Sequence, residues 1–332
     1  MKRLRTGILG CGGFANRHAQ NLTALREEIE LTTFCDHHDW NAREFSEKYA
    51  SGKGTVFTDH REMFEKGNLD LVVICLPPFA HSDEVELAAQ HGVHILIEKP
   101  IALTSEHAWR MVEAVEEVNI KTQVGFMFRF GAAIERLKDL ITSGEAGMAG
   151  LMSARYFCNS LHAAWWRDRR KSGGQLVEQI IHMVDLMRYL MGDAICVYSR
   201  QENLFHRDVP EYTVEDASAT VFGFQDGGIG VIYATNGAIP GKWINDYRLV
   251  AQKLTAEFSN SNNALFHFTA EAPVRTETIS SDKNVHLAEL QDLLTAIRTD
   301  GQTRTPLREG AKSLDMALAA TQSAQTHQEV AL

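Results

Sequence analysis

A glycine-rich stretch near the start of the chain constrains its fold more than any other feature. Residues 4–9 form an apolar run long enough for a buried strand, and Gly10-Cys11-Gly12 follows directly. Ala15 completes the pattern G-x-G-x-x-A before a segment that can form a helix. In this pattern the first glycine permits a tight turn, the second lets a pyrophosphate approach the backbone, and the small third residue lets the helix pack on the strand. The stretch therefore predicts a dinucleotide site at a helix N-terminus.

An acidic residue after the next predicted strand supports this interpretation. Residues 29–35 read as a strand that ends at Asp36, which lies 21 residues beyond Ala15. This is close to the spacing of about 20 residues at which an acid binds the ribose hydroxyls of the cofactor. The alternative is that Asp36 is only a turn residue before His37. Because a carboxylate at this position repels a 2′-phosphate, NAD is favoured over NADP as the cofactor.

The length and composition indicate a protein of two domains without a nucleic-acid role. The chain has 332 residues, 44% of them hydrophobic, and a formal net charge of −10. A nucleic-acid partner calls for a basic face, so none is expected. The five cysteines are scattered without C-x-x-C spacing, which is typical of reduced thiols in the cytoplasm. The sequence shows neither a leader nor an apolar span of membrane length, so no membrane partner is expected.

The pattern of predicted elements changes at about residue 125. Before it, strands and helices alternate, as in a doubly wound parallel sheet of the Rossmann type. After it, strand-like runs follow one another, which predicts an α+β domain with a mainly antiparallel sheet. We therefore expect an NAD-binding domain over 1–124 and a substrate-binding and oligomerisation domain over 125–332. The strands predicted for the second domain are 151–159, 196–204, 217–224, 228–235, 247–258, 264–269 and 274–279.

Two segments carry residue types suited to proton transfer. Lys99 follows the fifth predicted strand, where ligands of such sheets bind, although an ordinary surface turn is the alternative. On the predicted helix 173–191, Glu178 and His182 lie one turn apart, on the same face as Asp185 and Tyr189. A carboxylate can fix the tautomer of a histidine, which accepts protons near neutral pH. The alternative is a solvated stripe, and no metal site is expected because no third ligand stands at suitable spacing.

The loop before this helix contains Trp166 and Arg167, followed by Gly173-Gly174. It is either a basic surface loop with core tryptophans or a cover over the nicotinamide end of the cofactor. In the second case Trp166 would stack on the ligand and Arg167 would pair with oxygen atoms.

These residues, in this order, resemble the glucose–fructose oxidoreductase, inositol dehydrogenase and rhizopine-catabolism family (Gfo/Idh/MocA) over nearly the whole chain. The matching segments are Gly10 to His18, Leu76-Pro77-Pro78-Phe79-Ala80-His81, Glu98-Lys99-Pro100, Gly125-Phe126-Met127-Phe128-Arg129-Phe130, Trp166-Arg167 and Gly173-Gly174. The resemblance also leads us to expect a cis bond before Pro100.

The resemblance implies that Lys99 and His182 act together at the substrate hydroxyl, with Glu178 as the third catalytic residue. Cofactor contacts are then expected from Gly10, Gly12, Gly13, Phe14, Ala15, Asp36, His37, Leu76, Pro77, His81, Glu98, Lys99, Arg129, Trp166 and Arg167. Substrate contacts are expected from Lys99, Trp166, Arg167, Glu178 and His182. The sequence departs from the family pattern D-x-G-x-H-x-x-D, because Glu178 replaces the first acid and Ile180 the glycine.

The expected activity is an NAD-dependent transfer of hydride between the nicotinamide and a hydroxyl or carbonyl of a sugar, inositol or related polyol. Two alternatives remain open: a glycoside hydrolase or lyase that uses NAD for transient oxidation, and a non-catalytic NAD-binding regulator. We also expect a homo-oligomer, a dimer or tetramer, formed through the C-terminal sheet.

Overall fold

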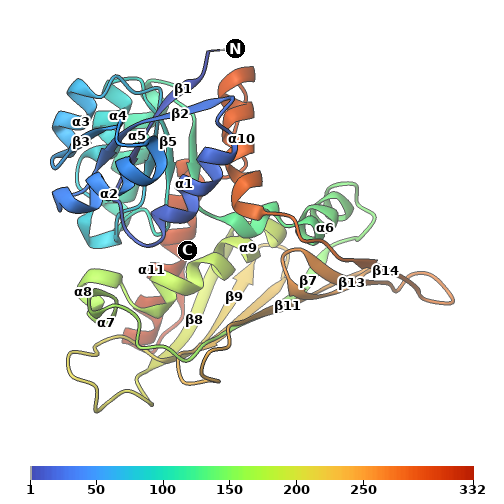
Figure 1. Ribbon diagram of the computed structural model, residues 1–332. Coiled ribbons are helices and arrows are strands. Elements are labelled where there is room, and N and C mark those ends of the chain that lie inside the picture. The colour runs from blue at the N-terminus through green and yellow to red at the C-terminus, as the bar shows by residue number, and fades with distance from the viewer. Residues whose placement is uncertain (1) are drawn as a thin grey trace. The chain divides into compact units, whose positions relative to one another are not determined.

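The computed structural model describes residues 2–332, and its chain forms two compact units (Figure 1). The first unit comprises the residues up to Ala102 together with Glu106–Gly125 and His286–Ala311. The second comprises Leu103–Ser105, Phe126–Val285 and Lys312–Leu332. The predicted change near residue 125 is therefore present, but the second unit is not the continuous stretch 125–332 that we expected.

The departure from the expected division has its cause in one helix, α10 (Val285–Thr299). Its buried leucines, Leu290, Leu293 and Leu294, belong to the same apolar core as Ala15 and Ala19 of the N-terminal region. Burial of these side chains against the first sheet's helices removes apolar surface from water, which is the main favourable contribution to such packing. The segment 286–311 therefore completes the first unit.

A six-stranded parallel sheet forms the centre of the first unit, in the order β3-β2-β1-β4-β5-β6. Its strands are β1 (Leu4–Leu9), β2 (Ile29–Cys35), β3 (Thr55–Phe57), β4 (Leu71–Ile74), β5 (His94–Ile97) and β6 (Thr122–Val124). The main helices besides α10 are α1 (Ala15–Ala24), α2 (Asp39–Ala50), α3 (His60–Lys66), α4 (Glu84–Gln90) and α5 (Ser105–Glu117). All four residues of β4 are buried, as expected for a strand covered on both faces. The predicted doubly wound sheet is confirmed.

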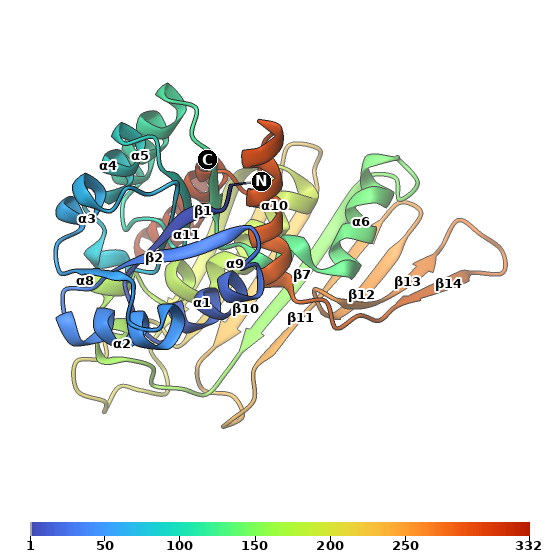
Figure 2. The same ribbon diagram turned by 45° about the horizontal axis from the view of Figure 1, so that its top comes forward.

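The second unit contains a nine-stranded, mainly antiparallel sheet, which confirms the predicted α+β class. The strand order is β14-β13-β12-β11-β7-β10-β9-β8-β15, and only β7 and β10 pair in parallel. Its strands are β7 (Ala149–Phe157), β8 (Ala194–Glu202), β9 (Ala217–Phe224), β10 (Ile229–Thr235), β11 (Ile244–Ala251), β12 (Thr255–Asn260), β13 (Asn263–Phe268), β14 (Arg275–Ile279) and β15 (Val330–Ala331). Figure 2 shows β7 and β10 to β14 side by side, with β14 at one edge of the sheet.

Helices cover one face of this sheet. They are α6 (Ala132–Thr142), α9 (Ile181–Met191) and the part of α11 (Leu307–Thr326) that belongs to the second unit. Their apolar side chains, such as Leu137, Leu186 and Met316, form one core with the inward residues of the strands. Burial alternates along the strands, which is the pattern of a sheet with one covered face. Within residues 2–332, no helix is long and apolar enough to cross a membrane.

Two predicted elements of the second unit are wrong in detail. The predicted strand 247–258 is two strands, because residues 252–254 form a tight turn that Ala251 N–H closes by donating to Leu254 O at 2.7 Å. The predicted helix 173–191 begins with a π-helical turn at Leu176–Ile180, and only then continues as α9. At its start the N–H of Leu176 donates to the carboxylate of Glu215, an acceptor from outside the helix.

A buried ion pair joins α9 to the turn before α6. The guanidinium of Arg129 donates from Nε and Nη2 to the two carboxylate oxygens of Asp185, at 2.8 and 2.6 Å. Both side chains are almost fully buried, and Ser313 Oγ donates a further bond to the same carboxylate. Asp185, which we expected on the polar face of the helix, is therefore part of the core.

Replacement of Asp185 by Asn should strongly destabilise the protein, because it leaves the buried Arg129 charge without its counter-ion. The expected loss is about 3–5 kcal/mol in the free energy of unfolding, measured by chemical denaturation. Glu116→Gln is the matched control, since Glu116 forms a half-exposed pair with Arg308. That control should cost less than about 1 kcal/mol. Equal losses in the two variants would contradict a structural role specific to the buried pair.

Candidate functional site

The carboxyl ends of five parallel strands lie in register at one edge of the first sheet. Leu9, the last residue of β1, pairs with Cys35 on one side and with Ile74 on the other. Ile74 pairs in turn with Ile97, and Ile97 with Val124. The residues that follow these ends therefore gather at the same edge, where doubly wound sheets bind their ligands. They are Gly10, Asp36, Cys75, Glu98 and Gly125.

The glycines of the first turn have different structural requirements. Gly10 has φ +86°, and a Cβ there would lie 2.6 Å from the carbonyl oxygen of Cys75. By contrast, a Cβ on Gly12 or Gly13 would meet no protein atom within 4 Å. Phe14 precedes α1 without a side-chain cap, and the first turn holds no acidic residue. Open space and uncapped N–H groups fit the pyrophosphate of a dinucleotide.

Asp36 is held firmly at the end of β2. Its Oδ2 accepts from the N–H of Cys11 at 2.9 Å, and its Oδ1 accepts from the N–H of His38 at 2.9 Å and from Asn41 Nδ2 at 3.1 Å. The carboxylate is thus tied directly to the glycine turn, while the neighbouring His37 side chain is exposed. This arrangement fits the expected role of Asp36 beside the ribose.

Glu98 forms a buried pair with His18 beneath the glycine turn. His18 Nε2 and Glu98 Oε1 lie 2.6 Å apart. Burial raises the pKa of Glu98, but the hydrogen bond with His18 and the charge of Lys99 outweigh it, so that the pKa lies below its ordinary value. A Cβ on Gly125 would approach Glu98 Oε2 to 2.8 Å, which explains a glycine there. The Lys99–Pro100 bond is cis, as predicted.

Sequence reasoning missed His286, which lies beside this pair. The ring of His286 lies 5.8 Å from that of Phe14 and 6.4 Å from that of His18. Burial and the charges of Arg17 and His18 lower its pKa to about 4, against the opposing effect of Glu98. Its Nδ1 is buried without a hydrogen-bond partner among residues 2–332. No local signal could have found this residue, because it comes from α10, far along the chain.

His81 anchors the loop that follows β4. Its Nδ1 lies 2.5 Å from Glu84 Oε1, and both side chains are buried. Although burial opposes ionisation, the bond and charge of His81 lower the pKa of Glu84 to about 2. Leu76 and Pro77, expected to contact the cofactor, stand at the start of this loop. The structure thus supports a positioning role for His81 within the loop.

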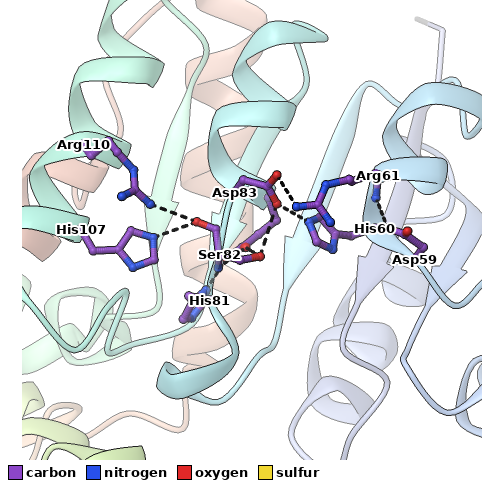
Figure 3. A network of polar contacts seen from close by, with 9 residues as sticks. Asp59, His60, Arg61, His81, Ser82, Asp83, His107 and Arg110 are labelled. Carbon is purple, nitrogen blue, oxygen red and sulfur yellow. Dashed lines mark hydrogen bonds and ion pairs between the residues drawn. The ribbon is translucent and has the colours of Figure 1, made fainter.

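A polar network fixes the same loop from outside (Figure 3). Asp83 accepts from His60 and from Arg61 at the start of α3, at 2.6 and 2.7 Å. The carbonyl of Ser82 lies within hydrogen-bond distance of His107 Nε2 and Arg110 Nη2, both from α5. The beginning of α4 is therefore tied to the helices on either side. This network stabilises the loop shape at the carboxyl edge of β4.

In the second unit, His182 is buried between aromatic rings at the start of α9. Its ring lies 6.2 Å from that of Phe126 and 5.2 Å from that of Phe128. Arg129, expected as a cofactor contact, is instead only 1% exposed and pairs with Asp185. The polar residues that we predicted on one helix face therefore have different surroundings: His182 lies near aromatic rings, and Asp185 belongs to a buried ion pair.

A hydrogen bond brings Trp166 and Glu178 together. Trp166 is buried in α7 (Ala164–Arg167), and its Nε1 donates to Glu178 Oε2 at 2.7 Å. Arg167 donates to the carbonyls of Leu161 and His162 at 2.8 and 3.0 Å. Its guanidinium thus shapes its own loop. Sequence reasoning missed His162, whose ring lies 4.3 Å from that of Trp166.

No metal is implied by either set of residues. Within residues 2–332, no three His, Cys, Asp or Glu side chains are grouped in a way that could hold a metal ion.

Comparison with known proteins agrees with this geometry. Residues 4–126 match the oxidoreductase family with an NAD-binding Rossmann fold, and residues 134–257 match the Gfo/Idh/MocA C-terminal domain. Myo-inositol 2-dehydrogenase of Thermotoga maritima is 28% identical over 239 residues, covering 72% of this chain and 70% of the relative. D-glucoside 3-dehydrogenase of Escherichia coli is 28% identical over 242 residues, covering 68% of each chain.

The fold is also that of a solved dehydrogenase. A levoglucosan dehydrogenase in complex with NADH superposes with a TM-score of 0.90 at 20% identity, over 99% of both chains. The chain is thus an NAD-binding oxidoreductase, and it belongs to the Gfo/Idh/MocA family. The glycine turn, the uncapped start of α1 and Asp36 are the residues that would hold the NAD.

Two glycine substitutions should separate folding from cofactor binding. Gly12→Ala should leave the stability nearly unchanged, because its Cβ meets no protein atom, yet it should weaken NADH binding by filling space that the pyrophosphate needs. Gly10→Ala should instead lower the unfolding free energy, through its positive φ and its contact with Cys75. Thermal unfolding and NADH fluorescence titration measure the two effects. Unweakened NADH binding in Gly12→Ala would contradict the assignment of the turn.

The buried His286 should make the stability depend on pH. Its folded pKa of about 4 lies below the ordinary histidine value of 6.5, so only the unfolded chain takes up this proton as the pH falls through that window. Stability therefore decreases from about pH 6.5 towards pH 4, by at most about 3 kcal/mol from this group. His286→Leu should flatten the dependence measured by urea unfolding at pH 7 and pH 5. His91→Leu, at an exposed position, is the control and should leave the dependence unchanged.

Proposed function

We propose that this protein is a dehydrogenase that transfers hydride between NAD and a hydroxyl or carbonyl of a sugar, inositol or related polyol. The observation that carries the proposal is the dinucleotide edge of the first unit, with the glycine turn and Asp36 in register. Relatives named as inositol and glucoside dehydrogenases support the substrate class. The acid at position 36 supports NAD in preference to NADP.

The proposed proton chemistry belongs to Lys99 and His182. When bound, NAD accepts the hydride from the substrate carbon. One of these two side chains takes the proton of the substrate hydroxyl, and Lys99 stabilises the developing alkoxide through its charge. Glu178 is proposed to keep an orienting role, which its hydrogen bond with Trp166 supports by fixing the carboxylate. Trp166 and Glu178 would contact the substrate, while Arg167 would act by shaping the loop.

Alanine substitutions test whether Lys99 and His182 act on one hydroxyl. Each single variant should lower kcat by about 10²–10⁴-fold, the usual contribution of a general acid–base group. The double variant should lose less than the product of the two single losses, because groups that act as a unit are not additive. Reduction of NAD is followed at 340 nm with myo-inositol, scyllo-inositol, D-glucose and methyl glucosides as candidate substrates. The NADH dissociation constant should stay nearly unchanged.

Matched surface variants show whether the losses are specific. Lys66→Ala and His91→Ala replace exposed residues of the first unit and should keep full kcat. Full activity in His182→Ala would refute the proposed mechanism, even if the protein were a polyol dehydrogenase. Absence of turnover by the unmodified protein on the whole panel would refute the substrate class.

The two other functions considered from the sequence predict different results. A hydrolase or lyase that oxidises its substrate transiently would retain NAD tightly and release no net NADH. A regulator would bind NADH without turnover on any polyol. The dehydrogenase is favoured because Lys99 and His182 are both present in a chain whose named relatives are dehydrogenases.

We also propose that the protein forms a dimer or tetramer through the second sheet. The face of this sheet opposite the helices carries large apolar side chains in adjacent paired positions. Ile229 pairs with Leu151, and Leu151 with Val250, and each of the three is more than two-fifths exposed. An exposed apolar area of this kind is typical of a protein interface.

All five cysteines are free thiols, which supports the proposed cytoplasmic location.

A further inference from the structure

A chain of hydrogen bonds in the second unit ends at His162, a residue that the proposed mechanism does not use. It begins at the fully buried Asn236, whose Nδ2 donates to Tyr212 Oη at 3.2 Å. The Oδ1 of Asn236 accepts from Gln175 Nε2 at 2.9 Å. Gln175 Nε2 also donates to Gln179 Oε1 at 3.4 Å. Gln179 Nε2 then lies 2.9 Å from His162 Nε2.

The direction of this chain sets the tautomer of His162. Gln179 accepts through its oxygen, so its other amide atom, the NH₂ that faces His162, can only donate. With the amides oriented in this way, the Nε2 of His162 accepts, which places the ring hydrogen of the neutral imidazole on Nδ1. Burial lowers the pKa of His162, and this favours the neutral ring. In this tautomer His162 carries its N–H donor at Nδ1, and its ring also interacts with the side chain of Asn236.

Other contacts fix His162 beside Trp166, which holds Glu178. The imidazole lies 4.3 Å from the ring of Trp166 and 5.7 Å from that of the exposed Trp243. Its backbone has φ +53°, a conformation that costs energy for a residue other than glycine. Ser160 Oγ accepts from its N–H, and Arg167 donates to its carbonyl. Such strain, held by neighbouring side chains, is characteristic of functional sites.

We propose that His162 is a specificity-determining residue that donates a hydrogen bond from Nδ1 to a hydroxyl oxygen of the substrate. The inference rests on the proposed polyol dehydrogenase function and adds a residue to it. A neutral donor beside indole rings suits a polyhydroxylated ring, whose C–H faces pack on aromatic surfaces while its oxygens accept hydrogen bonds. The buried amides behind the ring keep the donor in place without adding a charge.

Three variants separate the donor from the ring and from the backbone strain. His162→Asn keeps an N–H donor near the Nδ1 position and tolerates the left-handed backbone. His162→Phe keeps an aromatic ring but has no hydrogen-bond donor. His162→Gly keeps the backbone conformation but has neither a ring nor a side-chain donor. With the candidate polyol that the unmodified protein oxidises with the highest kcat/KM, His162→Phe and His162→Gly should both lose about tenfold in kcat/KM. His162→Asn should stay within about threefold of the unmodified protein, and NADH affinity should be equal in all three.

The tautomer is measured without any substrate. In protein labelled with ¹⁵N-histidine, the resonances that disappear in His162→Asn belong to His162, and their shifts should show the hydrogen on Nδ1. A hydrogen on Nε2, or a His162→Phe variant as active as the unmodified protein, would overturn the proposal. If the unmodified protein oxidises none of the polyols, the proposed function fails and the role of His162 fails with it. If the unmodified protein oxidises a polyol and the His162→Phe variant has the same kcat/KM, only the proposal for His162 is contradicted.

Discussion

The structure of the first unit depends on the in-register pairing of its parallel strand ends. Cys35, Leu9, Ile74, Ile97 and Val124 form one row across the sheet. A shift of one residue in any of these pairings would turn its apolar side chains to the opposite face. The same shift would move the functional residue after that strand away from the shared edge. Apolar packing and the position of the site are therefore fixed by the same hydrogen bonds.

Much of this first unit could be predicted from the sequence, because its signals are local. A glycine turn, an acid about twenty residues further on and continuous apolar strands each have a steric or electrostatic reason that holds within a short segment. The contribution of His286 could not be predicted in this way. It reaches the glycine turn only because the leucines of α10 pack against α1, and such packing depends on contacts between distant segments.

The second unit was harder to predict, for a related reason. The pattern of residues 173–191 indicates a regular helix with one polar face, but the helix starts with a π turn whose first N–H is taken by Glu215. Asp185 then pairs with Arg129, so an acid that shares the predicted polar face with Glu178 and His182 belongs to a buried ion pair. Helical periodicity cannot distinguish an acid that faces a site from one that meets a buried arginine. The partner of each polar residue decides its role.

Buried polar groups are satisfied in different ways at the sheet edge of the first unit and beside Trp166 in the second, although the second unit also holds the buried Arg129–Asp185 ion pair. In the first unit, carboxylate–histidine pairs such as Glu98 with His18 and Glu84 with His81 hold loops at the sheet edge. Charges are tolerated there because each has a close partner. Beside Trp166 the second unit instead uses a chain of neutral amides that ends at His162. A neutral network can orient a donor towards an uncharged hydroxyl without the cost of burying a further charge.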